Sequence, residues 1–194
     1  MDTKSVFGRE RSDAAVIADS AGRPEAFEAI FDRHFDAVQR YLARRAGSSR
    51  ADDLASATFV VAFERRHGFR EATSSARPWL FGIATNLLRN ELRSEHRALR
   101  ALARVGSELG HGDTDAAMLE STDLPALLAA LDADQRDVLL LYAWEGLSYR
   151  EIAVALGVPV GTIRSRLARA RARLRAELGG RRVSPGETNR RVTE

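Results

Sequence analysis

Apolar residues recur at helical spacing along most of the chain, and no segment shows the convincing alternation of a half-buried strand. The first strongly periodic stretch carries Phe27, Ile30, Phe31, Val38, Tyr41 and Leu42. These positions share one face of a helix, and a shorter helix over Asp13 to Ala21 is expected before it. The pattern therefore predicts an all-α protein.

Two further helices are expected in this N-terminal part. Gly47-Ser48-Ser49 should break the chain, and the helix that follows turns Leu54, Thr58, Phe59, Ala62 and Phe63 inward until His67-Gly68-Phe69 ends it. After a polar loop to Ala76, Pro78 suits the first turn of a long helix. Its apolar side carries Leu80, Ala84, Leu87, Leu88 and Leu92. We predict a helical domain over residues 13–98, with the last helix able to continue to Arg104.

A linker is predicted over residues 99–123. From Val105 to Asp123 the chain has no lysine or arginine but holds the acidic residues Glu108, Asp113, Asp115, Glu120 and Asp123. Its glycines Gly106, Gly110 and Gly112 argue against a helix. The segment is expected to be flexible, and a solvated spacer without a partner is an equally open interpretation.

A second helical domain is predicted over residues 124–178. Asp132 with Gln135, and Ser148 with Glu151, have the spacing of capping boxes. Gly146 and Gly157 are expected to stop the two helices that follow these caps, and Pro159 stands where a third begins. We expect Gly179-Gly180 to end the third helix and residues 179–194 to form a disordered tail.

The most specific stretch runs from Leu147 to Leu174, in the order capped helix, glycine turn and basic helix. Its last helix turns Ile163, Leu167, Ala170 and Leu174 inward and carries six arginines on its other sides, opposed only by Glu177. Such a helix, next to a helix-turn-helix, suits the phosphates and groove edges of DNA. An ordinary amphipathic helix with solvated arginines is the alternative.

Helical geometry at about 100° per residue fixes the positions that point outward from this helix. The DNA-facing candidates are Thr162, Arg164, Ser165, Arg166, Ala168 and Arg169. Ser165 and Arg169 are the choices for contacts with base edges, because the N-terminal part of a recognition helix normally enters the major groove. Arg171, Arg173 and Arg175 are expected to hold phosphates or to be solvated.

A second unusual face lies on the long helix after Pro78. Trp79, Ile83, Asn86, Asn90, Arg93 and Arg97 follow one another at spacings of three and four residues. Aromatic rings stack on unpaired bases, amides read their edges and arginines hold the backbone, and Phe69 in the preceding loop could add a ring. The alternative is that the apolar members are core and the polar ones solvated.

Composition narrows the function further. The chain of 194 residues has no cysteine, which excludes disulfides and thiolate metal sites, and its four histidines show no metal-ligand spacing. No apolar run is long enough to span a membrane and the N-terminus is polar, so we expect a cytoplasmic protein. No nucleophile–base pair or phosphate loop is evident, so we expect neither enzymatic activity nor a cofactor.

Taken together, these motifs resemble the extracytoplasmic-function sigma factors of the sigma-70 superfamily, over roughly residues 13–178. The first-domain match rests on Ala51 to Leu54, Ala57 to Phe63, Phe69-Arg70 and Arg77 to Asn90. The second rests on Leu147 to Ala153 and Gly157 to Leu167. Both motifs in this order are highly specific, whereas either alone would be only suggestive.

The resemblance implies a factor that joins RNA polymerase core, through the β′ clamp helices and the β flap, and directs promoter-specific transcription initiation. It assigns the binding of polymerase core to Asp52, Asp53, Thr58 and Phe59. It assigns recognition of the minus-ten element to Phe69 and to the face from Trp79 to Arg97. The helix-turn-helix would read the minus-thirty-five element. Many members are held by an anti-sigma factor. Ala57 and Asn90 depart from the family pattern, which often has acidic residues there.

Two other functions compete with this interpretation. A polymerase-independent helix-turn-helix regulator would explain the second domain but not the face from Trp79 to Arg97. An all-helical enzyme or interaction domain with an incidental basic helix would not retain DNA at low salt.

Overall fold

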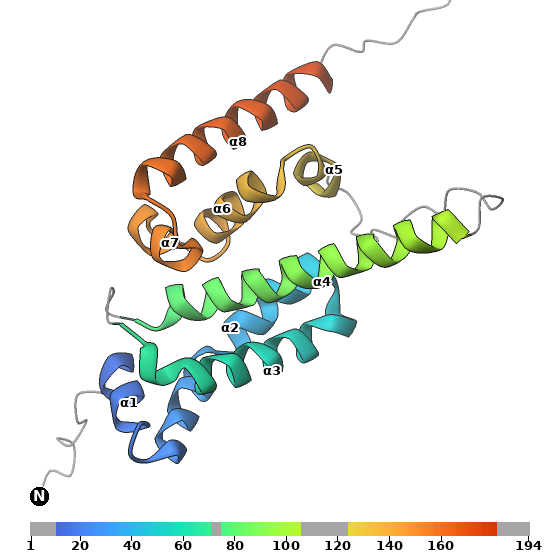
Figure 1. Cartoon of the computed structure of the whole chain (residues 1–194). Helices are drawn as coiled ribbons and strands as arrows, with labels where there is room; N and C mark the ends of the chain where they lie inside the picture. The colour runs from blue at the N-terminus through green and yellow to red at the C-terminus, as the bar shows by residue number, and fades with distance from the viewer. Residues whose placement is uncertain (1–10, 71–74, 106–123, 182–194) are drawn as a thin grey trace, which may run out of the picture.

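The computed structural model describes residues 11–70, 75–105 and 124–181, and throughout these it is helical with no strand (Figure 1). The N-terminal half contains α1 (Asp13–Asp19), η1 (Pro24–Phe27), α2 (Glu28–Ala46), α3 (Ser48–Arg65), η2 (Arg66–Gly68) and α4 (Arg77–Val105). The C-terminal half contains α5 (Leu124–Ala129), α6 (Ala133–Ala143), α7 (Tyr149–Leu156) and α8 (Val160–Arg181). The all-α prediction is therefore confirmed.

Helix α4 runs between the two halves, with α1, α2 and α3 on one side and α6, α7 and α8 on the other (Figure 1). In the N-terminal half, α2 and α3 pack side by side and both contact α4. Tyr41 from α2 is fully buried there, with its ring 5.3 Å from that of Phe81 and its hydroxyl 2.9 Å from Thr85 Oγ1. This core fixes which side of α4 faces outward.

Most of the helix caps and helix boundaries predicted from the sequence are present in the structure. Ser148 and Glu151 make a complete capping box on α7, and Gly157 ends that helix with a left-handed φ of 64° that favours glycine. Asp132 caps α6 by accepting a 2.7 Å hydrogen bond from the Gln135 backbone N–H, which is one of the two bonds of the predicted capping box. Pro159 immediately precedes α8. These predictions hold because each cap or helix end depends only on groups within a few residues of one another.

Four local predictions need correction. Helix α8 continues through Gly179 to Arg181, since glycine weakens a helix without forbidding it. The break at Gly47 involves that residue only, because Ser48 already begins α3. Helix α4 continues to Val105, into the range predicted as linker. Phe31 is 40% exposed rather than core, and it stacks on Phe35 at the surface.

The acidic part of the predicted linker, residues 106–123, and the tail beyond residue 181 lie outside the described residues. No helix in the part of the chain that the structure describes is long and apolar enough to cross a membrane.

Candidate nucleic-acid interface

The recognition helix of the predicted helix-turn-helix is α8, which packs on α6 and α7. Ile163, Leu167 and Ala170 are buried, as the periodicity predicted. They fix the rotation of α8, so that Arg164, Ser165, Ala168 and Arg169 are exposed and Thr162 is half-buried. The Ser165 hydroxyl donates to the Thr162 carbonyl at 2.9 Å, and this bond holds it against the helix until another acceptor displaces it.

Arg166 differs from its neighbours on this face. Its guanidinium is ion-paired with Asp134 of α6 and is only half-exposed, whereas Arg164 and Arg169 are exposed. Farther along α8, Arg171 lies over the Tyr142 ring and Arg173 pairs with Glu177 at 3.3 Å. Arg166, Arg171 and Arg173 thus have partners inside the protein, whereas Arg164 and Arg169 are exposed near the N-terminal end of α8 and Arg175 is exposed farther along.

The second candidate face lies along α4. Asn86, Asn90, Arg93 and Arg97 are all exposed and follow one side of the helix. A hollow of about 610 Å³ continues this side, lined by Asn90, Arg93, His96, Arg97 and Arg100. The amides and arginines therefore form one accessible basic strip, suited to an anionic backbone.

The apolar members of this face sit deeper. Phe69 and Trp79 are half-buried with ring centroids 5.0 Å apart, so the loop residue and the first turn of α4 are in contact. Ile83 is only 8% exposed and belongs to the core. A base could reach Phe69, Trp79 and Asn86 more readily than Ile83.

On α3, the residues matched to polymerase docking divide into two groups. Asp52 and Asp53 are exposed, and Asp52 accepts a 3.1 Å hydrogen bond from Gln39. Thr58 and Phe59 are buried, and the Thr58 hydroxyl donates to the Leu54 carbonyl at 2.7 Å. Any contribution of Thr58 and Phe59 to docking is therefore through the shape of α3 and not through direct contact.

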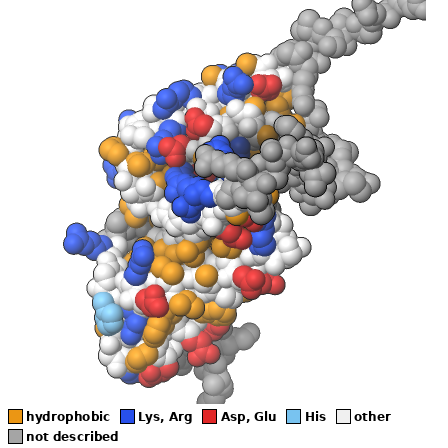
Figure 2. Space-filling model, turned by 45° about the vertical axis from the view of Figure 1, so that its right-hand side comes forward, with side chains coloured by type: hydrophobic (Ala, Val, Ile, Leu, Met, Phe, Trp, Pro, Cys, Tyr) orange, Lys and Arg blue, Asp and Glu red, His pale blue; other side chains and the backbone are white. Residues whose placement is uncertain are grey.

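Sequence reasoning missed two exposed apolar residues beside this acidic group. Val60 of α3 is 58% exposed, and the Phe31 ring on α2 lies 5.0 Å from that of Phe59. Figure 2 shows hydrophobic side chains gathered in the lower part of that view. An apolar residue among exposed acids on one helix face was the available signal.

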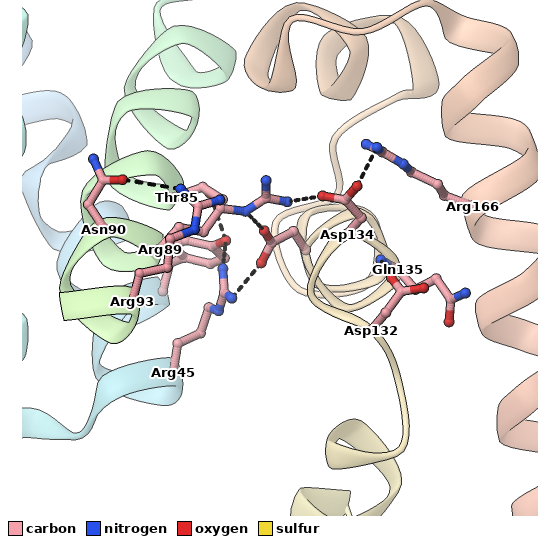
Figure 3. A network of polar contacts seen from close by, with 11 residues as sticks. Arg45, Thr85, Arg89, Asn90, Arg93, Asp132, Asp134, Gln135 and Arg166 are labelled. Carbon is pink, nitrogen blue, oxygen red and sulfur yellow. Dashed lines mark hydrogen bonds and ion pairs between the residues drawn. The ribbon is translucent and has the colours of Figure 1, made fainter. Parts of the chain in front are cut away.

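Sequence reasoning also missed the polar network that joins the two halves (Figure 3). Asp137 of α6 is fully buried and forms ion pairs with Arg45 of α2 and Arg89 of α4. Arg89 also donates to Asp134 at 2.7 Å. Burial lowers the pKa of Arg89, but attraction to Asp137 and Asp134 outweighs it and leaves the pKa above its ordinary value. Arg89 therefore remains charged beside its two carboxylate partners.

A second polar contact between the halves lies at the start of α4. Arg77 donates to the Glu145 carbonyl at 3.0 Å, and its guanidinium lies 3.7 Å from the Glu145 carboxylate. Burial raises the pKa of Glu145, against the attraction of Arg77, Arg44 and Arg40. Neither contact was foreseeable from spacing, because the partners are far apart in the chain.

No group of residues within the described ranges is arranged to hold a metal ion. The surfaces described above are made of arginines, amides, rings and carboxylates. Their chemistry suits nucleic acid on α4 and α8.

Comparison with known proteins decides the family. Residues 30–98 match the model for sigma-70 region 2, and residues 121–174 match that for sigma-70, region 4. The ECF RNA polymerase sigma factor SigC of Mycobacterium tuberculosis is 37% identical over 179 residues, which cover 90% of this chain and 95% of SigC. The chain belongs to the extracytoplasmic-function sigma factors. It is thus a transcription initiation factor that binds RNA polymerase core and directs it to promoters.

Other relatives agree with this membership. The ECF sigma factor EcfG of Rhodopseudomonas palustris is 36% identical over 149 residues, covering 75% of this sigma factor and 82% of EcfG. Among solved structures, CnrH in complex with the cytosolic domain of CnrY has a TM-score of 0.62 and 31% identity, covering 88% of this chain and 99% of that one. The sigma factor RpoE from Bartonella quintana, in complex with the anti-sigma factor NepR, has a TM-score of 0.56 and 26% identity, covering 79% and 96%.

Proposed function

We propose that the sigma factor divides promoter recognition between its two halves. Residues 13–98 dock on polymerase core and read the minus-ten element, residues 99–123 connect, and residues 124–178 read the minus-thirty-five element, with residues 179–194 as a tail. The observation that carries this proposal is α8. Its buried Ile163, Leu167 and Ala170 turn Ser165 and Arg169 outward at the N-terminal end, where a recognition helix enters the major groove.

On α4, the minus-ten element would be held as a separated strand. Phe69 and Trp79 offer rings in mutual contact, Asn86 and Asn90 offer amides, and Arg93 and Arg97 follow with positive charge. Unstacking a base costs a few kcal/mol, which ring contact and edge hydrogen bonds must replace. The exposed amides beside half-buried rings support this role. Ile83 would support the site from within the core.

Polymerase docking is assigned to the exposed face of α3. Asp52 and Asp53 supply charge, and exposed Val60 with Phe31 supplies apolar area that is otherwise left in water. We place the β′ clamp helices on this face and the β flap on the C-terminal half. Because polymerase works in the cytoplasm, we also assign the protein to that compartment. No catalytic step is assigned to this chain.

An anti-sigma factor is a further proposed partner. The similar RpoE structure is a complex with the anti-sigma factor NepR. The likeness of the fold supports a partner of this kind for the present chain, without indicating which protein it is.

The experiment that tests the proposal is run-off transcription with purified core polymerase on a library of genomic fragments. We expect transcripts from a limited set of fragments, only when core and this protein are both present. Specific DNA binding by the free chain, with no transcripts from the mixture, would instead identify a polymerase-independent regulator.

A further inference from the structure

The two edges of the exposed face of α8 differ in charge. Ser165 and Arg169 are exposed on this face, with Arg164 on one edge and Arg166 on the other. Arg164 is exposed and forms no ion pair within the described residues, whereas Arg166 is paired with Asp134 of α6 and its side chain is 19% exposed. One of the two arginines that flank the proposed base-reading positions is therefore neutralised within the C-terminal half (Figure 3).

Helical geometry places Arg166 beside the positions that are proposed to enter the groove. At about 100° per residue, Arg166 lies about 60° around the helix from Arg169, on the same side as Thr162. It also lies within the first two turns of α8, the part of a recognition helix that normally enters the major groove. An arginine at the side of such a helix is suited to a backbone phosphate. The carboxylate of Asp134 therefore occupies a guanidinium that a phosphate would otherwise bind.

Asp134 is held in place by more than its pair with Arg166. It lies in the first turn of α6, where the positive end of the helix dipole stabilises an acidic side chain. Its carboxylate also accepts a 2.7 Å hydrogen bond from Arg89 of α4. A carboxylate with these additional partners keeps its position when Arg166 leaves it. A phosphate that binds Arg166 must therefore displace this carboxylate and then lie close to its negative charge, which is unfavourable.

We propose that Asp134 competes with the DNA backbone for Arg166 and thereby limits the sequence-independent affinity of α8. Phosphate contacts supply most of the binding that does not depend on sequence, because every duplex offers the same phosphates. Withholding one arginine from them lowers this part of the binding and leaves the proposed base contacts of Ser165 and Arg169 unchanged. The inference rests on the proposed function of α8, because it concerns the same recognition helix.

The test compares Asp134→Asn with the parent, each as holoenzyme with core polymerase. One duplex is a promoter fragment transcribed in the run-off experiment, and the other is the same fragment with mixed sequence in place of its minus-thirty-five element. We expect Asp134→Asn to bind both duplexes more tightly than the parent, by the same factor. The slope of log affinity against log salt should steepen by about one unit. The gain should therefore be about 3.5-fold larger at about 50 mM than at about 200 mM salt.

Variants of the partner show whether the gain comes through Arg166. Arg166→Ala should bind no more tightly than the parent, and Asp134→Asn/Arg166→Ala should lose the gain seen in Asp134→Asn alone. If Asp134→Asn acted by loosening the contact between α6 and α4, the gain would persist without Arg166. Asp134→Glu keeps the carboxylate and should retain both the affinity and the salt slope of the parent.

Glu177 provides a matched control on the same helix. It pairs with Arg173 at 3.3 Å, so Glu177→Gln also removes one carboxylate and releases one arginine of α8. Both side chains of that pair are more exposed than Arg166, at 59% for Arg173 and 38% for Glu177. Because an exposed pair holds its arginine weakly, Glu177→Gln should raise the affinity much less than Asp134→Asn. Circular dichroism should show that each variant remains folded at the temperature of the binding measurement.

The possible results separate the competition from other effects. Unchanged or weaker binding by Asp134→Asn, or a gain that persists in Asp134→Asn/Arg166→Ala, would overturn it. Equal gains from Asp134→Asn and Glu177→Gln would indicate a general effect of net charge and would overturn it as well. A gain confined to the promoter fragment would place the effect in base reading, against the proposal. A parent holoenzyme that transcribes no fragment would instead contradict the proposed function.

Discussion

Asp13 and Ala76 lie 63 residues apart in the sequence, yet the Asp13 carboxylate accepts a 2.7 Å hydrogen bond from the Ala76 amide. The same carboxylate accepts from Ser75 Oγ at 3.0 Å and lies 2.8 Å from His34 Nε2. It thus ties α1 and α2 to the residues immediately before α4. Asp13 therefore anchors the residues that precede α4, the helix that carries the proposed minus-ten face.

The first prediction concerns the acid stability of this anchor. Burial raises the pKa of Asp13, but the Ala76 hydrogen bond, the attraction of His34 and the bonds from His34 and Ser75 outweigh it, so the folded-state pKa lies below its ordinary value. Its stabilisation is therefore present above the unfolded pKa of about 3.9 and is lost as the pH falls through the folded pKa. Asp13→Asn should lower the free energy of unfolding by about 1–3 kcal/mol near neutral pH and by much less in acid.

Urea unfolding of parent and Asp13→Asn across this pH range measures the difference directly. Asp32→Asn, an exposed carboxylate on α2, serves as the charge-matched control. A difference between Asp13→Asn and the parent that stays constant down to the lowest pH would contradict the assignment.

The second prediction separates base reading from phosphate binding on α8. Arg169 is exposed near the N-terminal end, whereas Arg173 lies farther along and pairs with Glu177. Arg169→Ala should relax the preference at one position of the minus-thirty-five element at a cost of about 1–3 kcal/mol. Arg173→Ala should leave the preference intact. Selection of a randomised minus-thirty-five library by each holoenzyme measures both sequence preferences. If Arg169→Ala weakened binding to all sequences equally, Arg169 would be assigned to phosphate binding and not to base reading.

The third prediction concerns polymerase docking. Asp53 is exposed on α3, so Asp53→Arg should weaken competition for core polymerase while leaving the thermal melting point close to that of the parent. Glu25→Arg makes the same charge change on an exposed residue away from α3 and should compete normally. Equal competition by the two variants would place docking elsewhere.

The fourth prediction concerns strand opening. Asn86 is exposed on α4 about two turns beyond Trp79, whose ring contacts that of Phe69. Asn86→Ala should reduce permanganate reactivity of the melted minus-ten bases more than it reduces filter binding of the closed complex, because an unpaired base loses an edge partner that duplex DNA never used. An equal loss in both measurements would exclude Asn86 from the base-reading role.

Local signals in the sequence were sufficient for most of the fold. The Ser148 capping box, the Gly157 turn and the buried spacing of Ile163, Leu167 and Ala170 each depend on residues within a few positions of one another, so the pattern carries them. The outward direction of Ser165 and Arg169 follows from that spacing. The same holds for the exposed strip from Asn86 to Arg97.

Contacts between distant residues were not predictable in this way. Asp137 looks like an ordinary helix carboxylate until α6 meets Arg45 and Arg89. Gly82 gave a partial signal, because an isolated glycine within a long helix usually has a packing reason. Only the fold identifies Ala155 as that reason.

Because Asp134 serves Arg89 and Arg166 together, the two halves are thermodynamically linked through one group. A ligand that draws Arg166 away leaves Asp134 fully available to Arg89, whereas a ligand that draws Arg89 away leaves it to Arg166. When one arginine leaves Asp134, the ion pair of Asp134 with the other arginine becomes stronger. Release of the second arginine is therefore harder than release of the first. On the proposed function, a DNA phosphate that takes Arg166 from Asp134 would strengthen the Asp134–Arg89 ion pair, so binding at α8 and loosening of the α4 contact would oppose each other.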